Sequence, residues 1–154
     1  MPGTLDKKTR IAKGIKPTAQ SIFSKYSTST KNLMSLVAEA NKGVNPQALM
    51  DITTISGYNN SQVADLLNIS EKTLTRYKSQ KKKLNPVNSE LALKLISLFK
   101  KGEEVFGELS SFKGWLEKPA YGLGNQVPYN LLHTSNGIDL VLEELIRIEY
   151  GDLA

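Results

Sequence analysis

The chain has 154 residues, no cysteine and a formal net charge of +5. The lack of cysteine excludes disulfides, thiolate metal sites and cysteine nucleophiles, and no apolar run approaches the roughly 18 residues that a membrane span needs. The first residues, MPGTLDKKTRIAKG, have no apolar stretch behind their charges and do not resemble a secretory signal, so we expect a cytoplasmic protein.

Positive and negative charges are divided between two parts of the chain. Residues 1–101 contain 17 Lys and Arg against 6 Asp and Glu, whereas residues 102–154 contain 3 against 9. This division favours two different partners, the first of them a polyanion. The alternative is a solvated surface whose charge is simply uneven.

The first part of the chain predicts a basic arm followed by two short helices. Residues 1–17 carry Lys, Gly and Pro and lack helical periodicity. Apolar residues then recur near helical spacing over residues 18–42. We expect two helices there, broken around Ser27–Thr30, with Gly43 closing the second.

Residues 45–106 predict four helices, each with an apolar face and capping residues. The helices are expected at residues 46–56, 61–67, 71–79 and 86–106. Their start and stop signals are Asn45-Pro46, Gly57, Ser70, Asn85-Pro86 and Gly107.

Past Gly107 the pattern changes to shorter elements. A short helix ends at Pro119, an irregular Gly-rich stretch follows, and residues 128–132 form one or two helical turns. Thr134 or Ser135 then opens a last amphipathic helix. No segment predicts a strand, so the expected fold is all-α: a helix-turn-helix bundle followed by a small helical module.

The segment NNSQVADLLNISEKTLTRY carries the spacing of a helix-turn-helix. Ala64 is small enough to let two helices cross closely, and Asn68 is the commonest non-glycine residue at a turn that needs a positive φ. Leu74, six residues beyond the turn, is expected to hold the second helix on the core. This is the pattern of DNA-binding units, although many such helix pairs bind no DNA.

The second helix of this motif would enter the major groove. Thr73 and Arg76 are expected to reach base edges, with Arg76 favouring guanine, and Ser70 at the helix start suits a phosphate. Glu71 argues mildly against DNA binding, whereas the lysines that follow would track the DNA backbone. The candidate DNA-binding residues are Ser70, Lys72, Thr73, Thr75, Arg76, Lys78, Lys81, Lys82 and Lys83.

The segment EEVFGELSSFKGWLEKPAYGLGNQVPYNLLHTSNGIDLVLEELIRIEYG resembles the C-terminal toxin-binding domain of the Xre/MbcA/ParS-type antitoxins. With the upstream NISEKTLTRYKSQKKKLNPVNSELA, the resemblance covers residues 45–154. Asn125 departs from the family, which often has a second glycine there. The ordered features that carry the resemblance are Phe106-Gly107, Phe112, Trp115-Leu116, Pro119, Leu123-Gly124, Pro128, Leu131-Leu132, Thr134, Gly137, Val141, Leu145 and Arg147–Gly151.

The resemblance implies a type II antitoxin that is encoded beside a toxin of the RES-domain class, which degrades NAD⁺. Such antitoxins typically dimerise, block the active site of the toxin and repress their own operon. The implied division is a basic arm with N-terminal helices (1–43), an Xre-like helix-turn-helix domain (44–101) and a toxin-binding domain (102–154). Residues 18–42 are our first candidate for the dimer surface.

The acidic C-terminal module suits a toxin whose site binds pyrophosphate, because such a site favours basic residues. Tyrosine and arginine are common interface anchors, although Arg147 has an equal claim to pair with Glu143 or Glu144 within its helix. Trp115 is assigned to the core and His133 to a structural or exposed role. The candidate toxin-binding residues are Arg147, Glu149, Tyr150, Gly151 and Asp152.

An enzyme is the least favoured class. The chain has one histidine, no glycine-rich phosphate loop and no carboxylate pair at a telling spacing, so we expect no catalytic residue, metal or cofactor. Two other classes stay open: a stand-alone helix-turn-helix repressor without a toxin partner, and a purely protein-binding antitoxin whose helix-turn-helix no longer binds DNA.

Overall fold

The computed structural model describes residues 17–151, which form ten helices and no strand. The fold is all-α, as predicted. Residues 1–16 of the predicted arm, and Asp152 of the candidate toxin-binding set, lie outside the described residues. In chain order the helices are α2 (Ala19–Lys25), α3 (Leu33–Lys42), α4 (Gln47–Ser56), α5 (Asn60–Leu66), α6 (Glu71–Gln80), α7 (Pro86–Phe106), α8 (Leu109–Leu116), η1 (Tyr121–Leu123), η2 (Pro128–Leu131) and α9 (Ser135–Glu149).

Most helices begin and end at the capping residues that the sequence predicts. Ser70 caps α6 by accepting a hydrogen bond from the backbone N–H of Thr73, and Asn85 caps α7 ahead of Pro86. Gly107, in the left-handed conformation, ends α7. Two helix starts differ by one residue from the prediction. Helix α4 begins at Gln47 with Pro46, not Asn45, at the N-cap, and α5 begins at Asn60 because Asn59 forms a capping box with Gln62.

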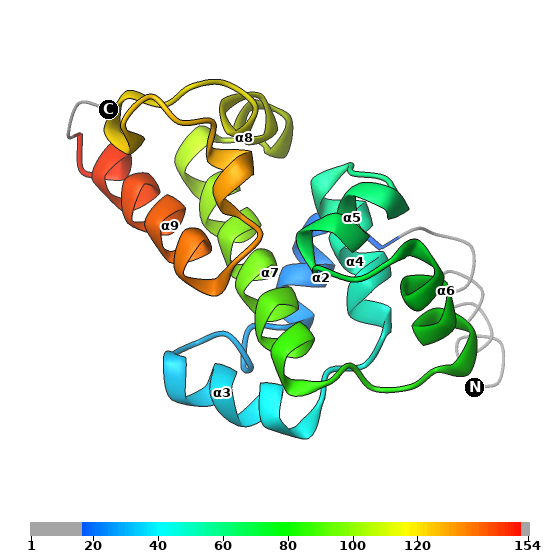
Figure 1. Ribbon diagram of the computed structural model, residues 1–154. Helices are drawn as coiled ribbons and strands as arrows, with labels where there is room; N and C mark the ends of the chain where they lie inside the picture. Colours follow the sequence, from blue (N-terminus) through cyan, green and yellow to red (C-terminus); the bar gives the residue numbers. More distant parts are fainter. Residues whose placement is uncertain (1–16, 152–154) are drawn as a thin grey trace, which may run out of the picture.

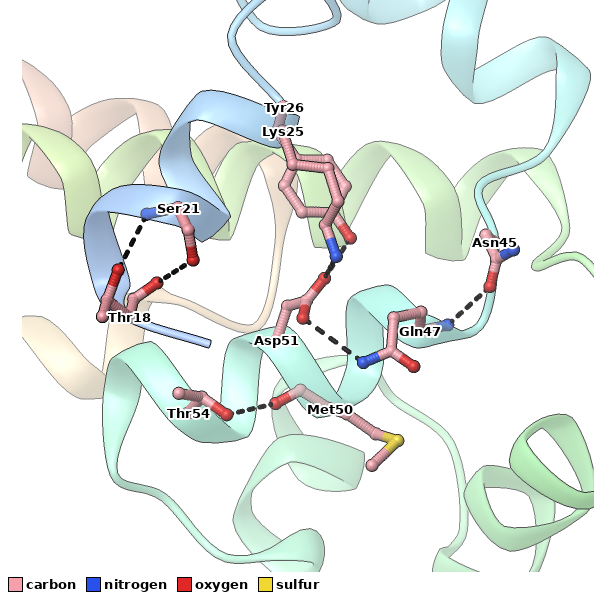
Figure 2. Close-up of polar contacts among 9 residues, drawn as sticks. All are labelled: Thr18, Ser21, Lys25, Tyr26, Asn45, Gln47, Met50, Asp51 and Thr54. Atoms are coloured by element: carbon pink, nitrogen blue, oxygen red, sulfur yellow. Dashed lines mark hydrogen bonds and ion pairs between the residues drawn. The ribbon is translucent and has the colours of Figure 1, made fainter. Parts of the chain in front are cut away.

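Helix α2 is attached to α4 through a buried carboxylate. Asp51 of α4 is 1% exposed, and its Oδ2 accepts a 2.5 Å hydrogen bond from Tyr26 Oη and lies 2.6 Å from Lys25 Nζ (Figure 2). Burial, and the hydrogen bond to Asp51, raise the pKa of Tyr26. The contact satisfies a carboxylate that would otherwise be costly to bury, and it fixes the N-terminal helices on the helix-turn-helix bundle.

Helix α7 is the central element of the fold. It runs through the middle of the molecule, with α4, α5 and α6 on one side, α9 on the other, α8 at its upper end and α3 below (Figure 1). Its buried apolar side chains belong to one core that also includes side chains of the helix-turn-helix and of α9. The predicted boundary after residue 101 therefore falls inside a continuous helix, and the N-terminal bundle and the C-terminal module share a core.

Candidate functional sites

The turn between α5 and α6 has the geometry that the motif predicts. Asn68 has a φ of 56°, in the left-handed region. The backbone N–H of Ile69 donates a 3.0 Å hydrogen bond to the carbonyl of Ala64, which is buried where the two helices meet. Leu74 is buried and holds α6 on the core. The chain thus presents α6 as the second helix of a helix-turn-helix.

One face of α6 is open to solvent. Lys72, Thr75 and Arg76 are exposed, and the C-terminal module does not cover them. Lys81, Lys82 and Lys83 are exposed directly after the helix. Arg76 and Lys82 line a cavity of about 400 Å³ together with Tyr77 and Gln80. Sequence reasoning missed this cavity and its two uncharged members, because it did not predict the left-handed Lys81 that ends α6 ahead of Lys82.

Three candidate DNA-binding residues are engaged within the protein. The hydroxyl of Ser70 accepts from the Thr73 backbone and donates to the Thr73 hydroxyl at 3.0 Å, so both side chains serve the helix cap. Lys78 Nζ donates a 3.0 Å hydrogen bond to Asn60 Oδ1 of α5, and partial burial lowers the pKa of Lys78. The positively charged side chains that stay exposed on α6 and directly after it are Lys72, Arg76, Lys81, Lys82 and Lys83.

Two candidate toxin-binding residues also form ion pairs within the chain. Arg147 donates to Glu144 Oε2 through Nε at 3.0 Å and through a terminal nitrogen at 2.5 Å. Glu144 is 1% exposed. Glu149 pairs with Lys101 of α7, and this hydrogen bond raises the pKa of Lys101. Of the alternatives set out for Arg147, the structure therefore contains the pair within its helix.

The remaining described members of the set lie at the exposed end of α9. Tyr150 is 80% exposed, and Gly151 follows it with a φ of 81°. Leu140 and Ile146 of α9 and Tyr121 of η1, which is 74% exposed, are further exposed apolar side chains of this module. Sequence reasoning missed these three. A signal existed for the two on α9, because Leu140 and Ile146 fall outside the buried stripe of that helix.

The aromatic cluster of α7 and α8 is structural. Trp115 is half-buried and stacks on the buried ring of Phe112 at a centroid distance of 6.1 Å. Phe106 contacts both rings. Within residues 17–151, no three His, Asp or Glu side chains gather as metal ligands, and no helix is long and apolar enough to cross a membrane.

Comparison with known protein families gives two adjacent matches. Residues 35–97 match the antitoxin Xre-like helix-turn-helix domain, and residues 101–151 match the antitoxin Xre/MbcA/ParS C-terminal toxin-binding domain. Together the two matches span about three quarters of the chain. They meet inside α7, close to the point where the charge of the sequence changes sign. A search of curated proteins found no match.

Proposed function

Because this chain carries both domains of an Xre-type antitoxin, we propose that it belongs to a type II system in which it blocks a RES-type, NAD⁺-degrading toxin and represses its own operon. The observation that carries the proposal is the union, in one chain, of an exposed cationic recognition helix and a toxin-binding module of opposite charge. The family matches support an antitoxin with a toxin partner; the class of toxin and the repression are our proposals.

The toxin-binding half rests on the surface around the end of α9. Residues 102–154 contain three times as many acidic as basic residues, which complements a site that binds pyrophosphate. Tyr150 and Tyr121 are large exposed aromatic side chains, the type that most often anchors an interface. Arg147 and Glu149 hold their own module together, so we assign them a supporting position and Tyr150 the central contact.

The test is inhibition of the purified product of the neighbouring gene. We expect that protein to consume NAD⁺ and the wild-type chain to stop it. Tyr150→Ser should weaken inhibition by about 30-fold, the loss typical of an interface anchor. The control is Val87→Ser, an exposed apolar residue at the start of α7, which should inhibit like wild type. A toxin that arrests growth without consuming NAD⁺ would contradict the RES assignment, and undiminished inhibition by Tyr150→Ser would contradict the proposed contact.

The DNA-binding half rests on the open face of α6. Arg76 presents a two-donor fork for guanine, and Lys82, beside it in the same cavity, is placed for a phosphate. In a gel-shift assay on the protein's own promoter, we expect Arg76→Ala with Lys82→Ala to abolish the specific complex. Lys118→Ala removes an exposed lysine of the C-terminal module and is the control for charge. Wild-type binding by the double variant would exclude α6 as the reading helix.

We also propose that the protein is a homodimer through α3, within the region that the sequence favoured. Leu33, Met34 and Val37 are exposed on one side of this helix, and Met34 is 79% exposed. Three neighbouring apolar side chains on a surface helix favour burial against a partner. Met34→Glu should give a monomer in light scattering, whereas Met50→Glu, on α4, should not change the mass. An unchanged dimer for Met34→Glu would place the dimer contact elsewhere.

A further inference from the structure

The C-terminal module contacts the turn of the helix-turn-helix directly. His133 lies in the segment between η2 and α9, and its backbone carbonyl accepts a 2.7 Å hydrogen bond from Asn68 Nδ2. Nε2 of the same histidine lies 2.9 Å from Oδ2 of Asp65, on α5. The ring of Tyr129 packs edge-on against the His133 ring at 5.7 Å. Two separate polar contacts therefore join this segment to the helix-turn-helix, one to the turn and one to α5, and we name Asp65, Asn68 and His133 the clasp.

The clasp explains a feature of Asn68 that the turn alone does not require. A φ of 56° is open to glycine as well as to asparagine, and glycine adopts it at less cost. The asparagine amide adds a hydrogen-bond donor, and that donor points to the C-terminal module. The side chain at the turn thus contacts a residue of the other module that lies 65 positions further along the chain.

The clasp lies directly before α6 and can therefore influence the direction in which this helix points. Asn68 stands two residues before Ser70, the N-cap of α6. Leu74 fixes the buried side of that helix, while the clasp fixes the preceding turn from the solvent side. Arg76 can reach a base edge only if α6 enters the groove at the correct angle, since base contacts demand a closer fit than phosphate contacts.

We propose that His133, with Asp65 and Asn68, is a positioning residue for DNA reading, so that the toxin-binding module supports the recognition helix as well as binding the toxin. This inference rests on the proposed DNA binding. It makes the C-terminal module part of the DNA-reading unit. Loss of the clasp lowers affinity for the specific site and leaves sequence-independent binding through the lysines intact.

The decisive variant is Asn68→Gly. Glycine accepts the left-handed backbone and removes the side-chain amide; the relief of backbone strain offsets the lost hydrogen bond and the added entropy of the unfolded chain, so the variant should melt close to the wild-type temperature. We expect the ratio of promoter affinity to affinity for unrelated DNA of equal length to fall roughly five- to tenfold, the effect of one hydrogen bond and its induced misalignment. A merely structural role would change the melting temperature and leave this ratio unchanged.

Substitutions at the other end of the clasp give an independent test. His133→Ala should lower the same ratio, and His133→Gln, which keeps a donor toward Asp65, should restore most of it. The control is Lys113→Ala, because Lys113 Nζ joins α8 to the Gly57 carbonyl at 3.5 Å without touching the turn. Its specificity ratio should equal that of the wild type.

The outcomes separate this inference from the proposed function. Specific promoter binding by wild type, with an unchanged ratio for Asn68→Gly and His133→Ala, overturns the positioning role and leaves operon repression standing. Failure of the wild-type chain to bind its promoter overturns operon repression and the positioning role together. Inhibition of the toxin should be the same for wild type and both clasp variants.

Discussion

Replacing Gly102 with alanine has two opposite effects on stability: alanine favours the helix, but its methyl group would overlap with a buried side chain. Gly102 is buried in α7, where alanine is ordinarily better than glycine by about 1 kcal/mol. An alanine Cβ would lie 2.5 Å from Cε2 of the Phe112 ring, and closer still to Cγ and Cδ2. Carbon atoms normally pack at about 3.5 to 4 Å. The ring must therefore move by more than a small adjustment.

Phe112 has little room in which to move. It is fully buried, and its ring packs edge-on against Phe99 at 5.2 Å and is stacked with Trp115 at 6.1 Å. Overpacking of this kind costs about 1 to 3 kcal/mol, and overlap with three ring atoms places it toward the upper end. After the gain in helix propensity, we expect a net loss of about 1 to 2 kcal/mol in the free energy of unfolding.

Urea unfolding followed by circular dichroism measures this loss, and Gly114→Ala supplies the matched control. Gly114 lies inside α8, and no atom outside its own helix turn stands within 4 Å of an added Cβ. The control variant should gain up to about 1 kcal/mol from helix propensity. If Gly102→Ala were as stable as Gly114→Ala, the packing of α8 on α7 described above would be wrong.

Three further changes test other contacts. Arg147→Ala leaves the buried carboxylate of Glu144 unpaired and should cost about 2 kcal/mol, less than a fully buried pair because Arg147 is half-exposed; an unchanged urea midpoint would contradict this. The pKa of Tyr26 is raised above its ordinary value of 10.0 by burial and by Asp51, so the unfolded chain ionises first and stability should fall as pH rises above about 10. Between about pH 8 and about pH 11 the melting temperature should fall less steeply with pH for Tyr26→Phe than for the wild type. Equal slopes would refute the assignment. Arg76→Ala should weaken promoter binding by about tenfold in fluorescence anisotropy, with the loss confined to one base position; equal losses on every sequence would make Arg76 a phosphate contact.

Local features of the fold were predictable because each is decided by neighbouring residues. The Ser70 and Asn85 caps, the Gly107 stop and the left-handed Asn68 depend on hydrogen bonds and backbone angles within one or two turns. The open cationic face of α6 followed from the same helical periodicity. For this reason the helix-turn-helix was the best-predicted part of the molecule.

Contacts between distant segments were not predictable from one sequence. The sequence contains no sign that Gly102 accommodates the Phe112 ring, or that the Glu144 carboxylate is buried against Gly122, although it left Glu144 open as a partner of Arg147. Helical periodicity places Glu144 on α9 but does not say which neighbour covers it. Because Arg147 and Glu149 are paired within the chain, Tyr150 replaces Arg147 as the main candidate for contact with the toxin.

The assignment of His133 shows the same limit. As a lone histidine between two helical segments, it had no pattern that named a partner. Its contacts with Asp65 and Asn68 exist only because α7 brings the C-terminal module back to the helix-turn-helix. The sequence predicted a DNA-binding part and a separate protein-binding part, whereas in the structure the two candidate surfaces lie on one shared core.

Co-purification with the product of the neighbouring gene tests the central claim most directly. The tagged wild-type chain, expressed with that gene, should retain the partner through gel filtration as one stable complex, and Tyr150→Ser should release most of it. A wild-type chain that elutes free of the partner at micromolar concentration, while the partner is folded and toxic when expressed alone, would contradict the account.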